Sequence, residues 1–345
     1  VASVLMYICQ IFALILTKNY YVFAIFLPLS TLFINLMRNI LVSKMYPDII
    51  CKGDMGKEFV KSLYKKVGAL IGHRIGTTII TSADSIVISA FLGLHVLAIY
   101  GNYYYILSSL IAVVTIFYTA TTASIGNSLI TSDTKKNYSD FKTFTFMNDW
   151  VVGWFTICLI CLYQPFMKIW MGEALMFPFH MVILMAIYFY TWLSRRIGLT
   201  YKDAAGLWAE DFWKPYVGSI VNVITNIALV KLIGVEGVVI STIIVMVIIY
   251  FPWETKVLFD KMFTDSAKEY CLKYYSYALV TIVGTCVTYW ICNLITIEGI
   301  LGLFIKACIC TIVPNILFVL VYFKTTEFKD TYSRIMNLIG RKVNS

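Results

Sequence analysis

The chain has 345 residues, of which 60% are hydrophobic and 14% charged, and its mean hydropathy is +0.79. A soluble domain of this length cannot cover its surface with so few polar side chains, so the composition excludes one and indicates that lipid is the solvent. The formal net charge is +9.

Ten apolar runs of helix length follow one another along the chain. About 20 apolar residues span a bilayer, and only helices or closed barrels satisfy the backbone there. The runs lie near residues 1–17, 20–42, 67–92, 96–120, 149–170, 179–197, 215–233, 237–255, 274–295 and 300–323. We therefore predict an all-α polytopic membrane protein with ten transmembrane helices.

Basic residues gather in every second connection between these runs. The long connections and the C-terminal tail hold 22 of the 28 Lys and Arg residues, whereas the short connections hold only Lys18, Lys168 and Lys231. By the positive-inside rule, we expect both termini in the cytoplasm and the protein in the cell inner (plasma) membrane. This asymmetry accounts for the net charge, so no nucleic-acid partner is needed to explain it.

The termini, connections and cysteines offer no sign of an enzyme. Val1 already lies in an apolar run, without an initiator Met or a signal peptide, so we expect an N-terminally truncated chain. No connection is long enough to form a catalytic domain. The nine cysteines lack the spacing and His partners of a metal site, so we interpret them as small buried hydrophobes and predict no metal and no cofactor.

The run from Gly68 to Gly93 carries ionisable residues at membrane depth. At about 100° per residue, its polar residues fall within roughly half of the helical wheel, with Ile88 the one apolar residue on that side. They are His73, Arg74, Thr77, Thr78, Thr81, Ser82, Asp84, Ser85 and Ser89. Such a face inside a span favours the lining of a water-accessible cavity, for which we select His73, Arg74, Thr77, Thr81 and Asp84.

A second interpretation is that partners on neighbouring helices neutralise Arg74 and Asp84 and lock the bundle. The two residues are about 15 Å apart along the axis, so they do not pair with each other. The next helix adds Tyr100, Asn102 and Tyr103 as candidates. Its tyrosines fit an interfacial belt as well as a cavity wall, and Asn102 favours a hydrogen bond between helices.

The connection from Arg195 to Pro215 is dense in balanced charge. Its candidate residues for the cytoplasmic entry of an anionic head group are Arg195, Arg196, Lys202, Asp203, Glu210 and Asp211. An amphipathic elbow at the membrane interface is the alternative reading of the same residues.

Three stretches carry a resemblance to a known family. They are residues 82–94 running into 99–103, residues 165–172, and residues 202–211 before Lys214 and Pro215. In them the chain resembles the polysaccharide-type (Wzx-like, O-antigen and capsule) flippases of the MOP exporter superfamily. That family's fold has two six-helix lobes and two further helices, fourteen in all, of which this chain would hold the last ten.

The resemblance implies a division of the chain. Residues 1–43 would be the last two helices of the N-lobe, 44–66 the cytoplasmic inter-lobe linker and 67–255 the six-helix C-lobe. Residues 256–273 would form a cytoplasmic loop, 274–323 the two extra C-terminal helices and 324–345 a basic cytoplasmic tail.

The resemblance also implies export of a polyprenyl-diphosphate-linked oligosaccharide by alternating access, in O-antigen, capsule or exopolysaccharide biosynthesis. Arg74 and His73 suit a diphosphate, because buried cations pair well with phosphate oxygens. Asp84 would repel it, which favours a role in coupling to H+ or Na+ or in closing the inward state. Expected partners are the lipid bilayer, a glycan polymerase and other assembly proteins.

Three other functions fit parts of the sequence. A multidrug or organic-cation antiporter of the same superfamily would prefer acidic cavity residues, against which Arg74 counts. A membrane-embedded glycan polymerase or acyltransferase would need a polar catalytic constellation, and His73, His95 and His180 are scattered. A scaffolding subunit without transport of its own is the third.

Overall fold

The computed structural model describes residues 2–47 and 56–343, and every element in these ranges is helical. The chain divides into two compact units, residues 1–61 and residues 62–345. The long helix α3 (Lys57–Thr131) begins at the end of the first unit and runs through the second.

The first unit is built on a helical hairpin. Helix α1 (Ala2–Thr17) packs against α2 (Tyr20–Met45) after a tight connection in which Lys18 has a φ of 50°. The Asn19 side chain caps α2 by accepting a hydrogen bond from the backbone N–H of Tyr21, at 2.9 Å. Most side chains described in this unit are exposed and apolar, as expected of helices that face lipid.

Seven of the described helical segments are long and apolar enough to cross a membrane. They are Tyr20–Met45, Leu70–Thr131, Thr134–Met171, Lys214–Ile233, Val235–Lys261, Ala267–Asn293 and Gly299–Tyr322. The protein is therefore a helical membrane protein with several spans. The predicted runs 1–17 and 179–197 correspond to shorter helices, so ten transmembrane helices and the MOP fold stay predictions.

Gly93 explains why two predicted runs appear as one segment. The runs 67–92 and 96–120 both lie in α3, which is interrupted at Gly93, where φ is 87° and ψ is 170°. A side chain disfavours this backbone conformation, so glycine permits the sharp change of direction there. The helix on each side of Gly93 matches one predicted run.

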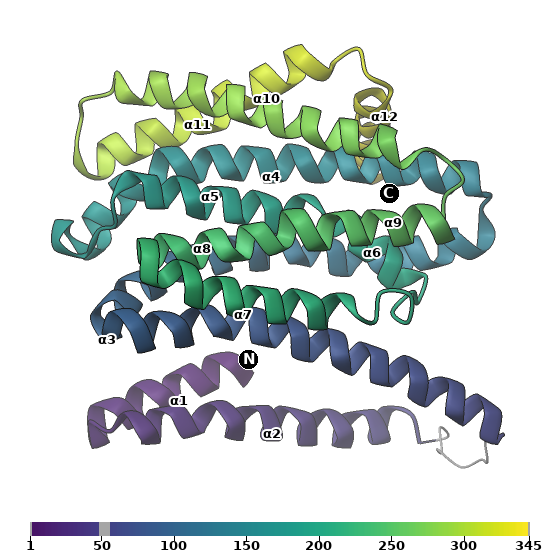
Figure 1. Cartoon of the computed structure of the whole chain (residues 1–345), viewed down its shortest axis with the longest axis horizontal. Coiled ribbons are helices and arrows are strands. Elements are labelled where there is room, and N and C mark those ends of the chain that lie inside the picture. Colours follow the sequence, from purple (N-terminus) through teal and green to yellow (C-terminus); the bar gives the residue numbers. More distant parts are fainter. Residues whose placement is uncertain (1, 48–55, 344–345) are drawn as a thin grey trace. The chain divides into compact units, whose positions relative to one another are not determined.

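Helix α4 (Thr134–Met171) has the most neighbours in the second unit. It packs against α5 (Phe179–Ser194), α10 (Ala267–Asn293) and α11 (Gly299–Tyr322), and Figure 1 shows α10 and α11 beside it. Aromatic rings fill much of this core, as where the ring of Phe141 meets that of Tyr201 edge-on and lies tilted against those of Phe263 and Tyr270. A short 3-10 turn (Glu173–Leu175) joins α4 to α5.

The second unit continues with helices α6 to α9, of which α8 packs against α5. Helix α6 (Arg196–Ala204) leads through a turn to α7 (Lys214–Ile233), which packs against α8 (Val235–Ile244). A π-helical stretch (Val245–Tyr250) continues α8 into α9 (Phe251–Lys261). Helix α3 approaches α7 closely at Gly76, where a Cβ would lie 2.5 Å from Cβ of Pro215.

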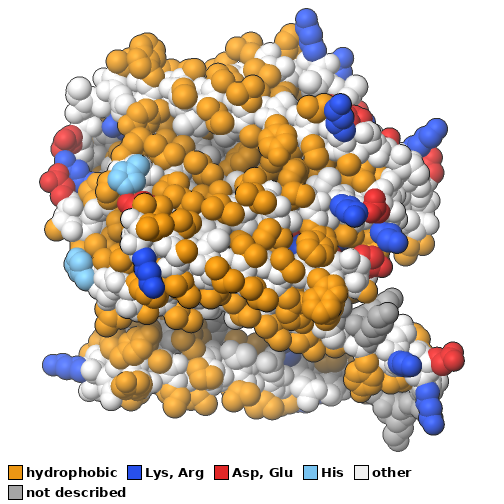
Figure 2. Space-filling view, viewed as in Figure 1, with side chains coloured by type: hydrophobic (Ala, Val, Ile, Leu, Met, Phe, Trp, Pro, Cys, Tyr) orange, Lys and Arg blue, Asp and Glu red, His pale blue; other side chains and the backbone are white. Residues whose placement is uncertain are grey.

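The surface of the second unit matches a membrane-spanning bundle. On the face drawn in Figure 2, hydrophobic side chains cover its middle, and most charged side chains lie towards its two ends. Exposed apolar residues of α7, the π-helical stretch and α10 include Ile220, Ile224, Ile248, Leu279 and Ile282. Such a band is compatible with lipid and would be unusual on a soluble protein.

The predicted basic tail contains a helix, α12 (Thr326–Val343). Two ion pairs hold it to the bundle, one between Glu327 and Lys273 of α10 and one between Arg334 and Asp140 of α4. The hydrophobic and charged residues of α12 separate onto opposite faces, as in a helix that lies at an interface.

Candidate functional site

A cavity of about 250 Å³ lies in the second unit, between α3, α6 and the start of α7. We call it the cationic cavity, because five Lys and Arg side chains line it against two carboxylates. The lining residues are Leu70, His73, Arg74, Thr77, Ile80, Trp192, Arg195, Arg196, Leu199, Lys202, Asp203, Trp208, Lys214, Pro215, Met246, Tyr250 and Glu254.

Asp211 holds three cationic or basic groups together beside this cavity. Its Oδ2 lies 2.7 Å from Nζ of Lys202 and 2.7 Å from Nζ of Lys214. Nε2 of His73 lies 2.9 Å from the other carboxylate oxygen and 3.3 Å from the carbonyl oxygen of Trp208. Asp211 is fully buried, and the two lysines replace the hydration of Oδ2. Its Oδ1 lies beside His73 of α3 but has no hydrogen-bond partner among the described residues.

Glu254 of α9 is the second buried carboxylate of the network. Arg195 donates to both of its oxygens, at 2.6 and 2.8 Å, and Lys214 donates to one of them at 2.8 Å. The Arg195 guanidinium also lies 5.3 Å from the ring centre of Tyr250, where the aromatic face favours a cation. Lys214 therefore bridges Asp211 and Glu254 in one continuous network.

Arg74 and Arg196 line the cavity without such a partner. Among the described residues, no carboxylate lies within ion-pair distance of either guanidinium. Arg74 is exposed, and Arg196 is half-buried with its guanidinium 5.9 Å from the ring centre of Tyr118. Their charges are available to an anion that enters the cavity.

The charges of this network determine the protonation states of those of its residues that lie outside the membrane spans. Burial alone would raise the pKa of Asp211, but His73 and the charges of Lys214 and Lys202 outweigh it and hold that pKa well below its ordinary value. Burial and the neighbouring charge of Lys214 lower the pKa of Lys202, which Asp211 partly offsets. Asp211 is thus ionised throughout the physiological range.

The local sequence explains how the turn between α6 and α7 reaches the cavity. After α6 ends at Ala204, Gly206 adopts a φ of 70°, which reverses the chain without steric cost. Trp208 donates from its indole N–H to Asp203 at 3.0 Å and fixes the turn. Asp211 then lies one turn before Lys214, at the start of α7.

The structure brings some of the candidates on α3 to the cavity and leaves others away from it. His73, Arg74 and Thr77 line it. Thr81 is half-buried and donates to the backbone oxygen of Thr77 at 3.0 Å, on its own helix. Asp84 lies further along α3 and does not belong to the lining residues.

Asp84 instead belongs to a group that we call the polar cluster, with Asn222, Asn226, Ser241 and Thr242. Asn226 donates to Oδ1 of Asp84 at 2.9 Å, and Thr242 donates to the same oxygen at 3.3 Å. Asn222 donates in turn to Thr242 at 3.0 Å. These contacts join α3 to α7 and α8, as the second interpretation of Asp84 would require, with neutral donors rather than a cation.

The tyrosines after Gly93 lie in the packed interior. Tyr103 is fully buried and donates from its hydroxyl to Gln164 at 3.1 Å, while its ring stacks on Tyr163. Tyr100 is buried with its ring stacked on Tyr104, and Asn102 is half-buried. None of the three belongs to the lining of the cationic cavity.

Most of the predicted entry residues do meet at the cavity. Four of them line it: Arg195, Arg196, Lys202 and Asp203. Asp211 lies directly behind the wall of the cavity, in contact with Lys202. Glu210 instead lines a separate groove, together with Lys256 and Lys261. The sequence analysis missed Glu254, Lys214 and Tyr250 as members of the site. An acidic residue at the end of the apolar run 237–255 was the available signal for Glu254.

No protein-family model, curated protein or solved structure matches this chain.

Proposed function

We propose that this protein is a flippase that moves a polyprenyl-diphosphate-linked oligosaccharide from the inner to the outer leaflet of the cytoplasmic membrane. The observation that carries the proposal is the cationic cavity, in which Arg74 and Arg196 have no acidic partner among the described residues. A diphosphate offers several anionic oxygens, and guanidinium groups bind such oxygens through paired, charge-assisted hydrogen bonds.

The other charges of the cavity support the same role. Asp211 and Glu254 are already occupied by Lys202, Lys214 and Arg195, so the network holds its shape without a ligand. An entering diphosphate would meet the two uncommitted arginines, one from α3 and one from α6. The polyprenyl chain would remain in the surrounding lipid.

The proposed orientation places the cavity at the cytoplasmic face, because the long, lysine-rich connections are expected there. Alternating access would then expose the head group to the other side. Asp84 lies outside the cavity and among neutral donors, which suits a site for the coupling ion, H+ or Na+, better than contact with the diphosphate.

The test is binding of a polyprenyl diphosphate to the purified chain in detergent, compared with the same polyprenol without phosphate. We expect the double variant Arg74→Ala/Arg196→Ala to bind the diphosphate at least about tenfold more weakly, because one charge-assisted hydrogen bond contributes about 1.5–3 kcal/mol. Lys231→Ala is the matched control, since Lys231 lies at the far end of α7 near Phe91.

Two outcomes contradict the proposal. Equal affinity for the diphosphate and the free polyprenol would mean that the cavity does not recognise the phosphate groups. Binding of a lipophilic cation such as tetraphenylphosphonium in place of the diphosphate would favour the organic-cation antiporter.

A further inference from the structure

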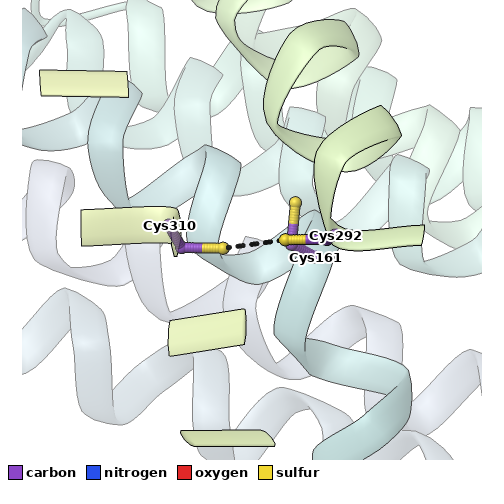
Figure 3. A group of neighbouring side chains, drawn as sticks. All are labelled: Cys161, Cys292 and Cys310. Atoms are coloured by element: carbon purple, nitrogen blue, oxygen red, sulfur yellow. Dashed lines mark hydrogen bonds between the residues drawn. The ribbon is translucent and has the colours of Figure 1, made fainter. Parts of the chain in front are cut away.

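Three buried cysteines meet between helices of the second unit, away from the cationic cavity. Cys161 comes from α4, Cys292 from the last turn of α10 and Cys310 from the middle of α11. Their sulfur atoms all lie within 4.8 Å of one another, and those of Cys292 and Cys310 are 3.8 Å apart. Figure 3 shows the side chains of Cys292 and Cys310 meeting, with Cys161 beside Cys292.

We propose that these three cysteines form a binding site for one soft monovalent metal ion, with Cu(I) as the physiological candidate. A metal bound to thiolates at about 2.3 Å in a trigonal plane holds its sulfur atoms about 4 Å apart. The observed separations need only a small adjustment to reach that arrangement. The interpretation of these cysteines as packing residues alone does not explain why the three thiols converge.

The donor set selects the type of metal. All three ligands are sulfur, and no His, Asp or Glu in the described part of the chain joins the group. Thiolate ligands favour soft ions such as Cu(I), whereas Mg²⁺ and Ca²⁺ require oxygen ligands. A structural zinc site is almost always four-coordinate, and this group supplies three ligands. The sulfur atom of Cys158 lies 3.9 Å from the carbonyl oxygen of Cys310, but it does not belong to the group whose sulfur atoms all lie within 4.8 Å of one another.

The protein encloses the three sulfur atoms. The three side chains are at most 5% exposed, so the site excludes water and hard ligands. For each cysteine that binds the metal, the S–H bond breaks, a metal–sulfur bond forms and the proton leaves to the solvent. Three thiolates and a monovalent ion leave a net charge of −2, or −1 when one cysteine keeps its proton. Lys306, one helical turn before Cys310 on α11, provides a positive charge that partly offsets it.

The metal would connect α4 to α10 and α11, which follow it much later in the sequence. Cys161 and Cys310 are separated by almost half of the chain, and α4, α10 and α11 already pack against one another. A ligand that binds only the folded state stabilises it by mass action, so occupancy raises the resistance of the bundle to unfolding.

The experiment is a titration of the purified protein with Cu(I) against bathocuproine disulfonate, in detergent, with reductant and without oxygen. We expect the wild type to retain one more Cu(I) per chain than the triple variant Cys161→Ser/Cys292→Ser/Cys310→Ser. The matched control is Cys286→Ser/Cys308→Ser, which changes two exposed cysteines of the same helices α10 and α11 and should retain the ion.

X-ray absorption on the loaded wild type provides the test that does not depend on the folding of a variant. We expect a first shell of sulfur at about 2.3 Å, and a shell of nitrogen or oxygen would overturn the proposal. Equal Cu(I) retention by the wild type and a folded triple variant would overturn it as well. So would a Cys292–Cys310 disulfide that persists under reductant and leaves no Cu(I) bound.

Discussion

Two buried carboxylates lie along the polar face of α3, and their surroundings differ. Near its start, His73 reaches Asp211, which is surrounded by the cations Lys202 and Lys214. Eleven residues further along, Asp84 accepts hydrogen bonds from the neutral side chains of Asn226 and Thr242. Both carboxylates are at least 95% buried, so burial alone does not distinguish them.

The difference lies in what each carboxylate stabilises. Asp211 balances charges that would otherwise be buried without a counter-ion, so the cavity depends on its negative charge. Asp84 serves as an acceptor for amide and hydroxyl donors, so the polar cluster depends on the number of hydrogen bonds. Substitution by the isosteric amide, which removes charge but keeps one acceptor, separates the two roles.

The largest effect is expected for Asp211→Asn. The amide leaves Lys202 and Lys214 without this counter-charge in a buried site, and removing one partner of a buried ion pair costs about 3–5 kcal/mol. We expect a large drop in the thermal unfolding midpoint of the purified protein in detergent. A midpoint close to that of the wild type would mean that water reaches the network and screens it.

Acid should weaken the cavity for the same reason. The pKa of Asp211 is depressed in the folded protein, so its contribution is fully present above the ordinary aspartate pKa of about 3.9. The contribution is lost progressively as the pH falls below that value towards the pKa in the folded state. We expect the unfolding midpoint of the wild type to fall more steeply from about pH 4 to about pH 2 than that of Asp211→Asn. Parallel curves for the two proteins would contradict this assignment.

Some of the helices and some of the cavity residues could be predicted from the sequence, because they follow a local periodicity. The apolar runs predicted helices, and the helical wheel placed His73, Arg74 and Thr77 on one face, where the structure has them lining the cavity. The charged connection after α5 was recognised by its density, and four of its six candidates line the same cavity. These signals need only neighbouring residues.

The rest depends on contacts between distant residues. Asn226 is 142 residues from Asp84, and Glu254 is 59 residues from Arg195, so their pairing follows from how helices pack rather than from spacing. The three cysteines each looked like an isolated small hydrophobe for the same reason. Gly93 shows a different limit, because a single positive φ decides whether two predicted helices join.

The smallest effect is expected for Asp84→Asn. The new amide keeps the oxygen that accepts from Asn226, and its N–H groups can donate to the hydroxyl of Thr242. One neutral hydrogen bond contributes about 0.5–1.5 kcal/mol, so we expect a change in stability of about 1 kcal/mol or less by thermal unfolding in detergent. A loss as large as that of Asp211→Asn would show that Asp84 balances a positive charge, such as a bound Na+, and would join the two ends of the polar face into one electrostatic unit.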